Sequence, residues 1–138
     1  MDWVLLLGRI LYGAVFIWSG FGFHLAGRQQ GVAYAAAKGA PMPEVTVPLT
    51  GVAIIAAGVM TIIGLWVDLA ALVLVVFLVL TAVIMHAFWK VDDPQEKLME
   101  QVQFTKDLAL AGGGLAFFYL FQQFGEEIGI TIEPALFD

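Results

Sequence analysis

Cysteine is absent from this chain of 138 residues, and charged residues are scarce. Without cysteine the chain can form no disulfide, no thiol-based redox centre, no iron–sulfur cluster, no c-type haem attachment and no cysteine zinc site. Six Lys and Arg residues stand against twelve Asp and Glu residues, which argues against nucleic-acid binding because such proteins carry a basic surface. Any redox role must therefore use a bound cofactor or a partner protein.

Apolar residues are abundant instead. They make up 61% of the sequence, charged residues make up 13%, and the mean hydropathy is +0.91. Soluble domains hold about 45–50% apolar and about 25% charged residues. A domain this small leaves about a third of its chain surface in contact with solvent, so the excess cannot all be buried. The composition excludes a soluble globular enzyme and a disordered chain, and it indicates a membrane protein.

Four apolar stretches are long enough to cross a bilayer, whose core takes about 20 helical residues. They cover about residues 3–23, 45–66, 69–89 and 105–124, and the charge-free part of the last begins at Leu108. The first stretch has no preceding positive charge and contains Arg9, so we expect a retained span and not a cleaved signal peptide.

The connections between these stretches carry helix start and stop signals. Only Val67 and Asp68 separate the second and third stretches, which predicts a tight hairpin with Asp68 as an N-cap. In the first loop, an Ala-rich run over 32–38 precedes Gly39 and Pro41 and predicts a short interfacial helix. Before the fourth stretch, Asp93-Pro94-Gln95-Glu96 is a capping sequence, which predicts one helix from Pro94 to Phe124.

The predicted fold is therefore an all-α integral membrane four-helix bundle, up-down-up-down, with a short interfacial helix in loop one. Residues 1–124 form the transmembrane domain, and residues 125–138 form an acidic extracytoplasmic tail. Five of the six basic residues lie in or beside loops one and three, and the sixth is Arg9. The positive-inside rule then places these loops in the cytoplasm and both termini outside the cell (inner) membrane.

Several short segments occur in an order that resembles a known family. They are Gly8-Arg9-Ile10-Leu11, Ser19-Gly20, Tyr34 to Pro41, Pro48-Leu49 with Gly51, Met85-His86-Ala87-Phe88-Trp89, and Gln103-Phe104 with Lys106 to Gly113. This set resembles the DoxX family of small four-helix membrane proteins, over roughly Leu6 to Leu115. The family takes its name from a membrane subunit associated with terminal quinol oxidase and thiosulfate:quinone oxidoreductase complexes. The resemblance implies a membrane oxidoreductase subunit.

The chain departs from the family pattern at three positions. Ala87 replaces the acidic residue that usually follows the histidine, Gln103 replaces a frequent His, and Asp107 replaces a frequent Asn. A His-Asp proton pair built on the residue after His86 is therefore absent here.

His24 and His86 are the candidate binding residues. They end the first and third spans, which run in the same direction, so both are expected at the cytoplasmic level. Two imidazoles at one depth could bind a quinone oxygen or ligate haem b from both faces. Trp89 could line the same site, although an aromatic belt explains the tryptophans at the span ends more simply. The cofactor remains unknown, with a quinone favoured over haem b.

Arg9, Asp68 and Asp107 are predicted to be structural. A charge inside a span needs a partner, so Arg9 is expected to reach the surface and pair with Asp68 or a tail carboxylate. The alternatives are that Arg9 anchors an anionic head group or that its charge faces the helix bundle. The tail from Gly125 is expected to be extended on the outer surface and bound to a partner.

Three functions follow. The first is an accessory subunit of a respiratory or related oxidoreductase complex, inactive alone, which packs against larger subunits and walls off lipid or a quinone near the histidines. The second is a stand-alone redox protein that binds haem b or quinone through His24 and His86. The third, a small-molecule carrier, is disfavoured because the spans hold few polar groups. Membrane lipids and other membrane subunits are the expected partners, and nucleic acid is not.

Overall fold

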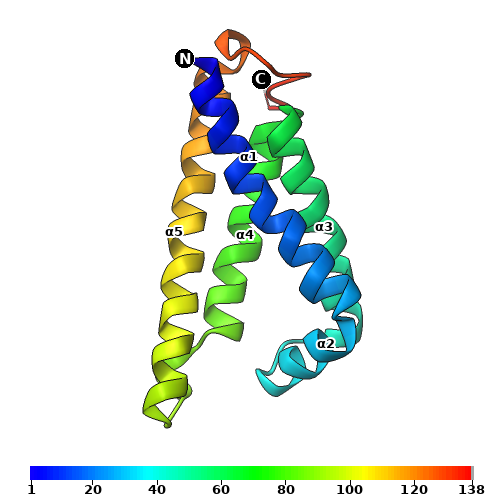
Figure 1. Ribbon diagram of the computed structural model, residues 1–138, viewed down its shortest axis with the longest axis vertical. Helices are drawn as coiled ribbons and strands as arrows, with labels where there is room; N and C mark the ends of the chain where they lie inside the picture. The colour runs from blue at the N-terminus through cyan, green and yellow to red at the C-terminus, as the bar shows by residue number, and fades with distance from the viewer. Residues whose placement is uncertain (138) are drawn as a thin grey trace.

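The computed structural model describes residues 1–137, and every regular element in that range is helical (Figure 1). The elements are α1 (Asp2–Ser19), the π-helix η1 (Gly20–Ala26), α2 (Arg28–Ala37), α3 (Pro43–Ile63), α4 (Val67–Met85), the 3₁₀ turn η2 (Phe88–Lys90), α5 (Pro94–Phe124) and the 3₁₀ turn η3 (Gly125–Glu127). Four helical segments in this range are long and apolar enough to cross a membrane. The predicted four-helix membrane bundle is confirmed.

The two ends of the bundle differ. Both termini and the α3–α4 connection lie at one end, called here the termini end (Figure 1). The other end, called here the loop end, carries α2 and the α4–α5 connection. The chain therefore runs up, down, up and down between the two ends.

Glycines allow α1 and α3 to pack closely. A Cβ atom at Gly13 would lie 2.5 Å from the Gly58 carbonyl oxygen, and one at Gly58 would lie 2.7 Å from the Gly13 carbonyl oxygen. In a bilayer the hydrophobic effect does not hold helices together, because the lipid tails are as apolar as the side chains. Close approach of the two backbones supplies van der Waals contacts instead. Beneath this contact the buried core joins Phe16, Ile54 and Leu74 from three helices.

The helix ends follow local signals with one exception. The Asp93 carboxylate accepts a hydrogen bond from the Glu96 amide at 2.9 Å, and α5 runs unbroken from Pro94 to Phe124 as expected. In contrast, α4 ends at Met85, four residues before the predicted limit of 89. His86 leaves the helix, and Phe88 and Trp89 pack against Phe104 of α5, which turns the chain toward the last helix.

Arg9 does not make the expected ion pair with Asp68. The side chain is 1% exposed, and it donates to the carbonyl oxygens of Thr61 (3.0 Å), Ile62 (2.6 Å) and Ile130 (2.9 Å). Thr61 and Ile62 belong to the last turn of α3, whose carbonyls have no partner within the helix. The negative end of the helix dipole also favours a cation there. Arg9 therefore caps α3 and holds the tail against it.

Asp68 is not the N-cap of α4, which begins one residue earlier at Val67. Its buried carboxylate instead accepts hydrogen bonds from the Leu69, Leu136 and Phe137 amides and from the Gln122 side chain. Residues 130–137 also pair with the α3–α4 connection, where the Trp66 amide donates to the Glu133 carbonyl at 2.6 Å. Beyond η3 the tail is thus extended, as predicted, and its own chain holds it, while binding to a partner stays a prediction.

Candidate functional site

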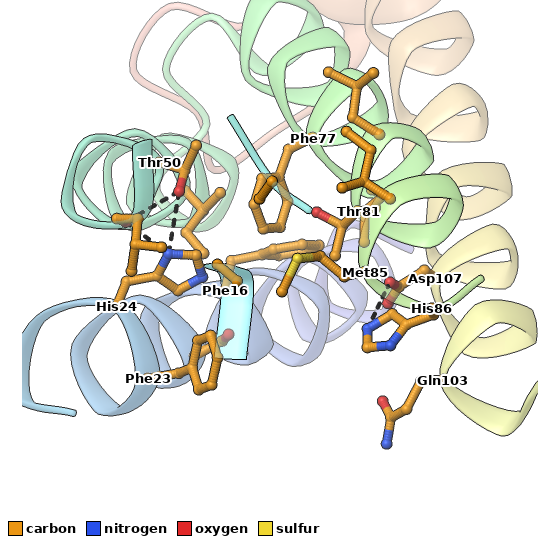
Figure 2. Close-up of a pocket in the computed structure, with 18 of the residues that line it drawn as sticks. Phe16, Phe23, His24, Thr50, Phe77, Thr81, Met85, His86, Gln103 and Asp107 are labelled. Atoms are coloured by element: carbon orange, nitrogen blue, oxygen red, sulfur yellow. Dashed lines mark hydrogen bonds and ion pairs between the residues drawn. The ribbon is translucent and has the colours of Figure 1, made fainter. Parts of the chain in front are cut away.

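A cavity of about 840 Å³ lies toward the loop end of the bundle (Figure 2). All five α-helices and η1 contribute to its wall, which is mostly apolar and includes Phe16 and Phe77. Among its polar side chains, His24 and Thr50 lie on one side, and His86 with Asp107 lies on the other. Ligand pockets have this character, with apolar walls and a few polar groups that orient the ligand.

His24 is held by the π-helix and by α3. The wide turn of η1 is closed by a hydrogen bond from the Gly27 amide to the Gly22 carbonyl at 2.9 Å, and π-turns of this kind are frequent at functional sites. The imidazole is 7% exposed, and its Nδ1 lies 2.8 Å from the Val47 carbonyl oxygen and 3.1 Å from the Thr50 hydroxyl. Gly51 makes this placement possible, because a Cβ atom there would collide with the His24 Cβ atom.

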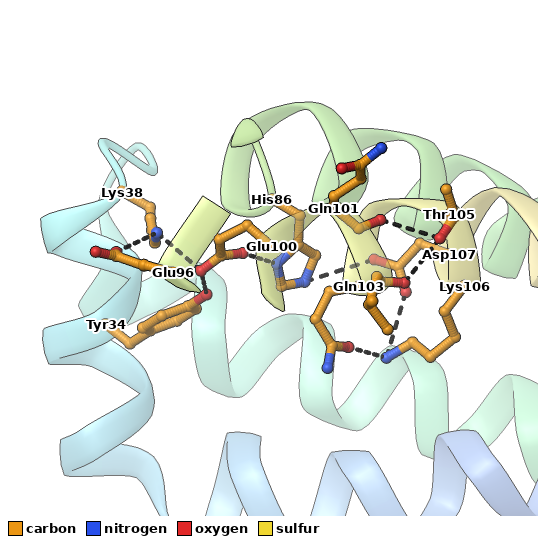
Figure 3. Close-up of polar contacts among 11 residues, drawn as sticks. Tyr34, Lys38, His86, Glu96, Glu100, Gln101, Gln103, Thr105, Lys106 and Asp107 are labelled. Atoms are coloured by element: carbon orange, nitrogen blue, oxygen red, sulfur yellow. Dashed lines mark hydrogen bonds and ion pairs between the residues drawn. The ribbon is translucent and has the colours of Figure 1, made fainter. Parts of the chain in front are cut away.

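His86 lies between two carboxylates. Its Nδ1 is 2.6 Å from Glu100 Oε2, and its Nε2 is 3.7 Å from Asp107 Oδ2 (Figure 3). The first distance is a short hydrogen bond, and the second is too long for one. Glu100 therefore fixes the orientation of the ring, which leaves the Nε2 side directed toward Asp107.

Glu100 joins α2 to the end of the bundle. Glu100 is only 7% exposed. Its carboxylate accepts hydrogen bonds from the Tyr34 hydroxyl and the His86 ring, and it forms an ion pair of 2.9 Å with Lys38. Burial, together with the hydrogen bond to Glu100, raises the pKa of Tyr34 above its usual value, so the phenol stays protonated and donates. Three donors on one buried carboxylate make this the main polar contact between α2 and α5 (Figure 3).

Asp107 faces the cavity from α5. Its Oδ1 atom lies 3.7 Å from Lys106 Nζ, and that ammonium group also donates to Gln103. Its Oδ2 atom is buried and finds no hydrogen-bond partner among residues 1–137. A buried oxygen without a partner is costly, and it marks a position where a ligand donor would be stabilised.

The structure brings two of the three candidate binding residues together and separates the third. His24 and His86 line one cavity, and Asp107, which was predicted to be structural, lines it as well. Trp89 is half exposed and packs edge-on against Phe88 and Phe104, outside that lining. The arrangement fits the aromatic-belt interpretation of Trp89 better than a role in ligand binding.

Sequence reasoning missed Glu100, which is buried and holds His86. The signal was present, because Glu100 and Asp107 are seven residues apart and so share one face of α5. Two carboxylates on one face beside a helix-ending histidine indicate a common polar cluster.

Comparison with curated proteins and with solved structures found no significant match. The family model for DoxX matches residues 4–87, which is more than half of the chain. The match runs from the first turn of α1 past the end of α4 and includes both histidines. Together with the four-helix membrane bundle, this match shows that the protein belongs to the DoxX family.

Proposed function

We propose that this protein is a membrane subunit of a quinone-linked oxidoreductase complex, and that it binds the quinone in the cavity between His24 and His86. The observation that carries the proposal is the cavity itself. Its volume of about 840 Å³ suits a substituted ring with part of an isoprenoid chain, and its apolar wall suits that chain. The polar groups on two sides suit a ring that bears an oxygen at each end.

Several features support an accessory role over a self-contained enzyme. The chain has no thiol, and residues 1–137 hold no group of three His, Cys, Asp or Glu side chains placed to bind a metal ion. The bound quinone would therefore be the redox group, and electrons would pass between it and a larger partner subunit. The exposed apolar side chains of the four spans contact lipid and offer the surface on which such a partner would pack.

Haem b, the alternative cofactor, fits the residues less well. Axial ligation would use one imidazole nitrogen from each histidine. His24 has its Nε2 atom free, but both nitrogens of His86 face carboxylates, at 2.6 Å from Glu100 and 3.7 Å from Asp107. Ligation through His86 Nε2 would place the iron in the 3.7 Å gap between that nitrogen and the Asp107 carboxylate.

The orientation of the bundle is part of the proposal. Lys38, Lys90 and Lys97 lie at the loop end, while the termini end carries the acidic tail. The positive-inside rule then places the loop end, with the cavity, on the cytoplasmic side of the cell membrane. A partner that exchanges electrons with the quinone would approach from that side or from within the membrane.

Copurification tests the proposal directly. The full-length protein is extracted from its native membrane in mild detergent, and organic extracts are analysed for quinones while copurifying subunits are identified. Ala53→Phe fills the cavity wall and is expected to remove the quinone. Ala56→Phe, an exposed position on the same helix, is the matched control and is expected to retain it. An extract without quinone from the unaltered protein would refute the proposal.

A further inference from the structure

The hydrogen bonding of His24 determines which face of the imidazole is available to a ligand. The Nδ1 atom lies 2.8 Å from the Val47 carbonyl oxygen, and a carbonyl oxygen can only accept. Nδ1 must therefore carry the proton. In a neutral imidazole the other nitrogen, Nε2, is then a bare acceptor.

Nothing around His24 favours a second proton. The ring is 7% exposed, and the groups that face it are the Val47 carbonyl, the Thr50 hydroxyl and the aromatic rings of Phe23 and Phe77. None of these is a carboxylate. A buried imidazolium without a counter-charge is strongly disfavoured, so the ring is neutral.

The free Nε2 atom points into the cavity, away from α3 (Figure 2). It is thus an acceptor, and a ligand group placed against it must be a hydrogen-bond donor. The hydroxyls of Ser19 and Thr81 and the amide of Gln103 do not discriminate in this way, because each can both donate and accept. The ammonium group of Lys106 can only donate, but it already donates to Gln103 and lies 3.7 Å from Asp107. Asp107 Oδ2, on the other side of the cavity, is a buried oxygen without a hydrogen-bond partner among residues 1–137.

From this geometry we infer that His24 is a specificity-determining residue, and that the cavity binds the reduced hydroquinone in preference to the oxidised quinone. The inference rests on the proposed function and names the redox form of its ligand. A hydroquinone carries a hydroxyl that donates to Nε2. A quinone presents a carbonyl lone pair to the Nε2 lone pair and leaves both unsatisfied. A buried mismatch of that kind costs about tenfold or more in affinity.

Nitrogen NMR of histidine-labelled protein tests the first step without any substitution. The chain has only two histidines, so two imidazoles give the whole spectrum, and His86→Gln assigns them. The expected result for His24 is a protonated Nδ1 and a bare Nε2 at neutral pH. A protonated Nε2 on His24 would overturn the inference.

Binding calorimetry under argon tests the second step. The full-length protein in detergent is titrated with decylbenzoquinone and, separately, with the corresponding hydroquinone. The hydroquinone is expected to bind about tenfold or more tightly, which raises the midpoint potential of the bound couple by about 30 mV for each factor of ten. His24→Gln supplies an N–H donor and is expected to abolish the preference. Thr105→Val, an exposed position on α5 outside the cavity, is expected to keep it.

The outcomes separate the inference from the proposed function. Equal affinity for the two forms, or tighter binding of the quinone, would overturn the inference and leave quinone binding in place. No binding of either form would overturn both.

Discussion

Replacing Glu100 with Gln is expected to detach α2 from the bundle. The substitution keeps the shape of the side chain but removes the charge that accepts from Tyr34 and His86 and pairs with Lys38. It also places an amide N–H₂ group among three donors, where at most one oxygen can still accept.

The magnitude follows from the burial of these groups. Each hydrogen bond to a charged group contributes about 1.5–3 kcal/mol, and removing one partner of a buried ion pair costs about 3–5 kcal/mol. Because the three contacts share one carboxylate, they are not additive. We expect Glu100→Gln to destabilise the docking of α2 by about 3 kcal/mol.

Hydrogen exchange measured by mass spectrometry on residues 28–37 reports this loss directly, because released helices exchange their amides faster. Glu96→Gln is the matched control. Glu96 lies on the same helix, its side chain is 59% exposed, and it lies 3.8 Å from Lys38. Exposed pairs of this kind contribute at most about 1 kcal/mol. Equal protection of residues 28–37 in both variants would refute the reasoning.

Three further predictions concern other parts of the molecule. Gly51→Ala should displace His24 and weaken quinone binding at least about tenfold in a binding titration. Gly112→Ala, whose added Cβ atom has no neighbour within 4 Å, should leave the quinone affinity unchanged. Asp68→Ala leaves the Leu69, Leu136 and Phe137 amides without their acceptor, so limited proteolysis should cut the tail sooner; an unchanged digestion pattern would count against this role. Because the chain has no cysteine, single cysteines can be introduced and labelled with an impermeant thiol reagent. A cysteine at position 132 should react in intact cells, and one at position 92 should react only after lysis. The reverse pattern would invert the proposed orientation.

The helices were predictable from the sequence because the bilayer imposes a length and a composition on each span. The start of α5 was predictable to the residue, since Asp93 and Pro94 act locally. The end of α4 was not. It depends on the packing of Phe88 and Trp89 against Phe104, which lies on another helix and is invisible to local pattern.

The candidate site was predictable only in part. Span direction sufficed to expect His24 and His86 at one level, because each ends a helix that runs the same way. The partners of charged groups were harder to foresee. Charge complementarity suggested that Arg9 pairs with Asp68, whereas in the structure both side chains bond mainly to backbone groups at helix ends and in the tail. Such partners carry no sequence signature.

The π-helix at Gly20–Ala26 has a consequence for how this segment can change. Its backbone hydrogen bonds join residues five apart instead of four. The turn therefore holds one more residue than an α-helical turn closed by the same kind of bond. Deleting a single residue there would let the segment rejoin α-helical register. The residues before and after the turn would then keep their orientation around the helix axis. Only the side chains of the widened turn itself, His24 among them, would change direction, which makes this turn a natural point of divergence between related sequences.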